Sequence, residues 1–105
     1  IIPMSSIEDI NHLLHSISRI VKENVSCEYQ LFLFGSRATV TNDIKADIDI
    51  GIIPNKKLSA RQLQNIKENI EELSTLLKID FIDFSSVSDE FKSIALMNTK
   101  DIIFD

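Results

Sequence analysis

Two aspartates separated by one residue are the feature of the sequence that points most directly to chemistry. Asp47 and Asp49 belong to a run over residues 47–53 that alternates polar and apolar side chains before Pro54, which predicts a β-strand. Because side chains alternate across a strand, both carboxylates should point to one side and the isoleucines to the other. Like charges held this close repel each other, and a divalent cation such as Mg²⁺ relieves that repulsion through oxygen ligands.

A third carboxylate can join this pair from the segment 79–84, which also alternates and predicts another strand. Its period directs Asp80 away from Ile79 and Phe81, which we expect to face the core. Asp80 could therefore share the solvated face with the first two aspartates. Asp83 competes for this role, but strand parity directs it to the other face, which favours Asp80.

A glycine–serine turn precedes the aspartates. Gly35 is one of only two glycines, and it follows a predicted strand over residues 28–34. A glycine lets the backbone come close to a ligand, and exposed N–H groups at the start of a helix favour an anion. Ser36 can donate a hydrogen bond to a phosphate oxygen, and Arg37 can add positive charge. On its own the turn is a weak signal, since such turns more often simply reverse the chain.

Three carboxylates beside a phosphate-binding turn form a physical unit for nucleotidyl transfer. Metal ions on Asp47 and Asp49 would bind the phosphates of a nucleoside triphosphate and hold the leaving pyrophosphate in line. Asp80 would complete a second metal site and help to deprotonate the attacking hydroxyl. We therefore expect all three carboxylates to be catalytic residues and ligands of two Mg²⁺ ions. The residues expected to contact the nucleotide are Gly35, Ser36 and Arg37.

Length and composition limit the other possibilities. A chain of 105 residues fits one domain over residues 1–105, and 44% hydrophobic with 26% charged residues is typical of a globular protein. Eleven basic and sixteen acidic residues give a net charge of −5, which argues against direct binding of nucleic acid. No apolar run approaches the roughly 20 residues that cross a bilayer, so we expect a cytoplasmic protein that does not bind membranes.

The remaining pattern predicts the elements that position these residues. Apolar spacing predicts a helix over residues 5–25, and Ser59 with Gln62 has the capping-box spacing that starts a second helix. The buried stripe of this second helix is expected to be Leu63, Ile66, Ile70, Leu73, Leu76 and Leu77. Ser88 should cap a short helix, and residues 101–105 could add a last strand or fray. Alternating helices and strands predict an α/β or α+β fold, a small mixed sheet with helices packed mainly on one face.

The spacing of the motifs resembles the signature of the DNA polymerase β-like nucleotidyltransferase superfamily, and within it the small MNT (minimal nucleotidyltransferase) proteins. That signature is a glycine–serine pair, ten intervening residues and Asp-x-Asp, which Gly35-Ser36 and Asp47-Ile48-Asp49 fit. The predicted elements also follow the order of the family from about residue 7 to the C-terminus. The resemblance therefore implies one polymerase β-like nucleotidyltransferase domain.

Three positions depart from the pattern of many relatives. Such relatives carry an arginine and a glycine after the Gly-Ser-Arg-Ala stretch and a serine before the first aspartate. This chain has Thr39, Val40 and Ala46 at the corresponding places. The residues expected to bind metal are retained.

The resemblance implies a substrate and a partner. Small MNT proteins are typically encoded beside a HEPN-domain protein, and the two resemble a toxin–antitoxin pair in which the HEPN member is an RNase. The resemblance implies transfer of AMP from ATP to a tyrosine of the toxin, with this chain as the antitoxin. The negative net charge would suit a basic partner. Two alternatives remain: a non-catalytic module that neutralises its partner by complex formation, and a nucleotidyltransferase that modifies a small-molecule hydroxyl.

Overall fold

Four strands form one mixed β-sheet in the order β3-β2-β1-β4. The computed structural model describes residues 6–35, 48–73, 75 and 77–103. Strand β1 (Tyr29–Phe34) pairs antiparallel with β2 (Ile48–Pro54) and with β4 (Thr99–Asp101), and β2 pairs parallel with β3 (Ile79–Asp83). The predicted mixed sheet is confirmed. The last strand, expected over residues 101–105, instead covers Thr99–Asp101.

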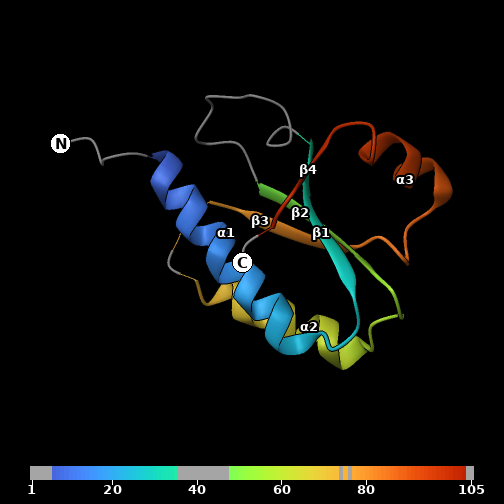
Figure 1. The fold of residues 1–105 in the computed structure, drawn as a ribbon, viewed down its shortest axis with the longest axis horizontal. Helices are drawn as coiled ribbons and strands as arrows, with labels where there is room; N and C mark the ends of the chain where they lie inside the picture. Colours follow the sequence, from blue (N-terminus) through green and yellow to red (C-terminus); the bar gives the residue numbers. More distant parts are fainter. Residues whose placement is uncertain (1–5, 36–47, 74, 76, 104–105) are drawn as a thin grey trace.

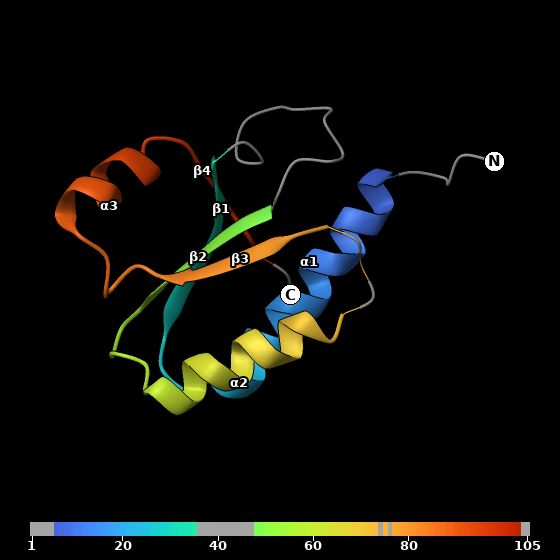
Figure 2. The same ribbon diagram turned by 180° about the vertical axis from the view of Figure 1, so that it is seen from behind.

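Three helices flank the sheet in the described part of the chain. The helices α1 (Ser6–Asn24) and α2 (Ala60–Glu71) lie side by side on one face, as Figures 1 and 2 show from opposite sides. The short helix α3 (Asp89–Ala95) lies on the other side of the sheet, apart from the first two (Figure 2). The main helical layer is thus on one face, as predicted, and α3 adds partial cover to the opposite face. Among the described residues, no helix is long and apolar enough to span a membrane.

The predicted caps are present at the start of α2 and α3. The Gln62 N–H donates to the Ser59 hydroxyl at 3.0 Å, and the Ser59 N–H donates to the Gln62 side chain at 2.9 Å, which completes a capping box. The Phe91 N–H donates to the Ser88 hydroxyl at 3.2 Å. Each cap satisfies backbone donors that have no partner within the helix, so these residues fix where the two helices begin.

Helix α2 ends earlier than its apolar stripe. The stripe continues to Leu77, but the helix ends at Glu71. A continued helix would direct the Leu77 N–H to the carbonyl of Leu73, whereas here it donates to the Thr75 hydroxyl at 3.1 Å. Leu73 and Leu77 still pack against the core from beyond the helix, and Leu76 lies outside the described residues. The chain thus leaves the helix after Glu71 without loss of these apolar contacts.

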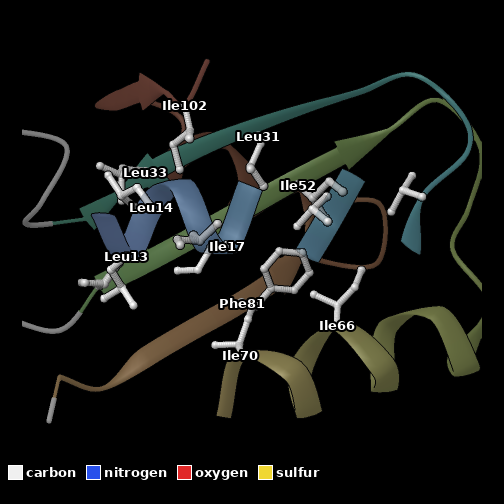
Figure 3. Close-up of a cluster of buried hydrophobic side chains, with 14 of the residues drawn as sticks. Leu13, Leu14, Ile17, Leu31, Leu33, Ile52, Ile66, Ile70, Phe81 and Ile102 are labelled. Carbon is white, nitrogen blue, oxygen red and sulfur yellow. The ribbon is translucent and has the colours of Figure 1, made fainter. Parts of the chain in front are cut away.

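Aliphatic side chains fill the space between the sheet and the pair α1 and α2. Ile48, Ile50 and Ile52 of β2 all point into this layer and are fully buried. Figure 3 shows the residues that meet them from the surrounding elements, among them Leu13, Leu14, Ile17, Leu31, Leu33, Ile66, Ile70, Phe81 and Ile102. Because alternate β2 residues are held in this core, the intervening residues must face the other side of the sheet.

Aromatic rings cover part of that other side. The ring of Phe84 packs edge-on against Phe32 and Phe34, with centroids 5.1 Å apart in both pairs. Gly51 of β2 lies beneath two of them, because a Cβ there would come within 2.5 Å of Phe32 Cζ and of Phe84 Cε1. Gly51 therefore leaves the room that the rings occupy.

We expect Gly51→Ala to lower the free energy of unfolding by about 1–3 kcal/mol, because the added methyl overpacks the ring cluster. Urea denaturation measures this loss. Adding Phe32→Leu removes the ring atoms that the methyl would meet, so the double variant should lose less stability than the sum of the two single losses. Strictly additive losses would contradict the steric explanation.

Candidate active site

Two carboxylates meet across neighbouring strands at one end of the sheet. Asp49 of β2 is in register with Asp80 of β3 on one side and with Phe34 of β1 on the other. Asp49 lies between two buried isoleucines of the α1 and α2 face, so its side chain belongs to the α3 face. On β3, Asp80 is next to Phe81, whose side chain faces the core. The Asp80 side chain therefore points to the α3 face as well. The structure therefore brings Asp49 and Asp80 together on one face, where both are partly exposed.

Asp83 has a different environment from Asp80. Asp83 lies two residues after Phe81 on β3, so its side chain points to the same face as Phe81, and it is only 7% exposed. One carboxylate oxygen accepts hydrogen bonds from the Ser85 N–H at 2.9 Å and from the Ser85 hydroxyl at 2.7 Å. These bonds form the turn that follows β3. Asp83 thus has a local structural role, on the face opposite to Asp49 and Asp80.

Gly35 places the backbone of the turn against the Asp49 carboxylate. Its φ of +72° lies in the left-handed region that side chains rarely adopt. A Cβ at this position would also come within 2.5 Å of Asp49 Oδ2. The conformation and the close approach each favour glycine here. Because Gly35 has no side chain, the turn after β1 can lie directly against the Asp49 carboxylate of β2.

The other predicted site residues lie outside the described part of the chain. These are Asp47, Ser36 and Arg37, and the departures Thr39, Val40 and Ala46 lie there too. Within the described ranges, no group of three or more His, Cys, Asp and Glu side chains is placed to hold a metal ion. The described part of the site therefore consists of two carboxylates and one glycine of the turn.

The described residues fit a hard divalent cation. Neighbouring strands lie about 4.8 Å apart, so carboxylates in register on one face can both direct oxygen atoms at one ion. Mg²⁺ prefers oxygen ligands and usually keeps several waters, so one or two protein carboxylates suffice to hold it. The donor set of Asp49 and Asp80 therefore suits Mg²⁺.

An aromatic cluster lies on the same face of the sheet as the two carboxylates. Phe34 is the register partner of Asp49, and its ring lies 5.1 Å from that of Phe84 and 6.3 Å from that of Phe91. Phe91 belongs to α3, so this helix is attached to the sheet next to the site. The pattern of the sequence indicated α3 and its cap, but gave no sign that its aromatic residue would pack against Phe34, the register partner of Asp49.

The chain is similar to one known family and to a curated protein. Residues 9–105 match the family model described as Polymerase beta, Nucleotidyltransferase. A curated relative from Haemophilus influenzae, a probable protein adenylyltransferase MntA, is 24% identical over 79 residues, which cover 75% of this chain and 69% of the relative. The family match thus extends over nearly the whole chain and includes every residue of the candidate site.

Two solved structures have a similar fold. One is a tri-AMPylated Shewanella oneidensis HEPN toxin in complex with MNT antitoxin, with a TM-score of 0.66, 17% identity and coverage of 89% of this chain and 71% of the other. The second is a toxin–antitoxin with AMP-PNP, with a TM-score of 0.69, 18% identity and coverage of 88% and 73%. At these identities the likeness establishes a common fold.

Replacing Gly35 tests the contact between the turn and Asp49. We expect Gly35→Ala to lower the free energy of unfolding by about 1–2 kcal/mol, which is the cost of a left-handed conformation. It should also displace the Asp49 carboxylate and so weaken the binding of Mn²⁺, used here in place of Mg²⁺. Gly35→Asn is the matched control, because asparagine adopts this conformation more easily while its Cβ still meets Asp49. Chemical denaturation and Mn²⁺ titration measure the two effects. Normal Mn²⁺ affinity in both variants would contradict the inferred close approach.

Proposed function

The chain belongs to the Polymerase beta nucleotidyltransferase family, and from this premise we propose that it transfers AMP from ATP to a hydroxyl group of a partner protein, with Mg²⁺ as cofactor. The observation that carries the proposal is the register of Asp49 and Asp80 beside the backbone of Gly35. This arrangement combines oxygen ligands for a cation with a glycine turn that a phosphate can approach closely. The relative from Haemophilus influenzae, a probable protein adenylyltransferase, supports a protein as the acceptor.

Each site residue has a proposed role. Asp49 and Asp80 hold the cation through carboxylate oxygens, together with Asp47. Mg²⁺, when bound, supplies positive charge that offsets the negative charge of the triphosphate. Gly35 allows the backbone to approach the phosphates, which the Ser36 hydroxyl and the Arg37 guanidinium bind. Asp80 also accepts the proton of the acceptor hydroxyl.

The proposed acceptor is a tyrosine of a HEPN-domain toxin, which would make this chain an antitoxin. The support comes from the solved structure of similar fold in which a tri-AMPylated HEPN toxin is bound to MNT antitoxin. The other structure of similar fold, a toxin–antitoxin with AMP-PNP, supports an adenosine nucleotide as the donor. The net charge of −5 would steer a basic partner towards the chain.

Transfer of label from ATP tests the activity. The purified protein is incubated with Mg²⁺, α-labelled ATP and host lysate, and we expect label on one discrete protein band. Asp49→Asn and Asp80→Asn should each reduce the transfer at least about 100-fold, because each removes a charged oxygen ligand of the cation.

The matched control for these variants is Asp83→Asn, which makes the same substitution on the same strand. Its amide oxygen can still accept the bonds from Ser85, so transfer should stay within about twofold of the wild type. The proposal fails if the wild type labels no protein, or if Asp49→Asn and Asp80→Asn retain full activity.

A further inference from the structure

Strand β3 forms one edge of the sheet and pairs only with β2 in the part of the chain that the structure describes. The Ile48 N–H donates to the Lys78 carbonyl at 2.9 Å, and the Phe84 N–H donates to the Ile52 carbonyl at 2.9 Å. Because backbone groups alternate in direction along a strand, the even-numbered residues of β3 bond to β2 and the odd-numbered ones point outward. The N–H and C=O groups of Ile79 and Phe81 therefore face away from the sheet.

A groove runs along this outer edge, between β3 and α2. Its volume is about 320 Å³, which about ten water molecules would fill. The groove is lined by Lys67, Ile70 and Glu71 of α2 and by the four β3 residues from Ile79 to Ile82. In Figure 3, Phe81 and Ile70 lie at the junction of the two elements. One wall of the groove thus includes Asp80, a residue of the candidate active site.

We propose that the acceptor segment of the partner protein binds in this groove as an extended strand, paired with the outward backbone groups of Ile79 and Phe81. The inference rests on the proposed function and adds the place and the conformation of the acceptor. Outward N–H and C=O groups that alternate along an edge match another extended backbone, whereas a helix has already used its own backbone groups. A segment bound here delivers its hydroxyl side chain next to Asp80.

The charge around the groove indicates which residues flank the hydroxyl residue in the acceptor segment. On the α2 side, the groove is lined by one acidic residue, Glu71, and one basic residue, Lys67. The surface of α2 beside it carries Glu68 and Glu72 as well. The surroundings are therefore predominantly acidic, which fits an acceptor segment with Lys or Arg next to its hydroxyl residue.

The reaction at this place balances without a further reactant. The acceptor oxygen forms a bond to the α-phosphorus of ATP, and the bond from that phosphorus to the oxygen bridging the β-phosphorus breaks. The products are the adenylylated side chain and pyrophosphate. The hydroxyl proton passes to the carboxylate of Asp80 and then to solvent.

Removal of an outward N–H group tests the strand pairing. Ile79→Pro removes the N–H that faces the groove and leaves the hydrogen bonds to β2 in place, whereas Ile79→Val keeps that N–H and serves as the control. The acceptor is the protein that acquires label in the lysate experiment. We expect Ile79→Pro to raise the KM for this acceptor about five- to tenfold, with the KM for ATP unchanged. Ile79→Val should stay within about twofold of the wild type for both substrates.

A second pair of variants covers the case in which Ile79→Pro fails to fold. Glu71→Lys reverses a charge that lines the groove, and Glu68→Lys makes the same change on α2 outside it. Both sites lie near the C-terminal end of the helix, where a positive charge is favourable, so the fold should be kept. Only Glu71→Lys should raise the KM for the acceptor, and the increase should shrink at high salt.

A synthetic peptide that spans the labelled residue of the acceptor separates the possible outcomes. The peptide should accept AMP, and methylation of its backbone amides should abolish that transfer. If the wild type modifies the acceptor but Ile79→Pro and Glu71→Lys leave its KM unchanged, the groove inference is wrong and the proposed function stands. If the wild type modifies nothing, both fail.

Discussion

The parallel register between β2 and β3 is the constraint on which the candidate site depends. It sets Asp49 opposite Asp80, and the bonds from the Ile48 N–H and the Phe84 N–H hold it at the two ends of the strand pair. A shift by one residue would turn Asp80 into the core and bring Phe81 to the solvated face, at the cost of burying a charge. The apolar layer beneath the sheet therefore determines where the carboxylates lie.

The sequence was sufficient for the local features and for the direction of the side chains. Alternation of polar and apolar residues correctly indicated β2 and β3, and the capping residues Ser59 and Ser88 correctly marked where two helices begin. Strand parity also predicted that Asp80 shares a face with Asp49. The register that sets the two residues opposite each other was not predictable, because it depends on packing between segments that are distant in sequence. The end of α2 at Glu71 was missed because the apolar stripe continues beyond it, where Leu73 and Leu77 contact the core without being part of the helix. Gly51 gave no signal because its neighbours in space, Phe32 and Phe84, are distant in sequence.

Both glycines of the chain are explained by what a Cβ would meet. At Gly51 the neighbours are aromatic rings, and at Gly35 the neighbour is a carboxylate oxygen. The first glycine lets the aromatic cluster close over β2, and the second lets the turn close over Asp49. Gly51 and Asp49 lie two residues apart on the same face of β2. Packing of the aromatic cluster and the position of the Asp49 carboxylate therefore depend on each other.

The connection between β2 and β3 has a consequence for when the site forms. The parallel partners Ile48 and Ile79 can pair only after the chain between them, which includes α2, has folded back across the sheet. Closing so long a loop costs entropy before any contact repays it, which delays such pairings during folding. A newly synthesised chain would present single carboxylates, each without its neighbour, until α2 docks. The carboxylate pair therefore forms late in folding. A partly folded chain would lack the paired carboxylates and the activity that depends on them.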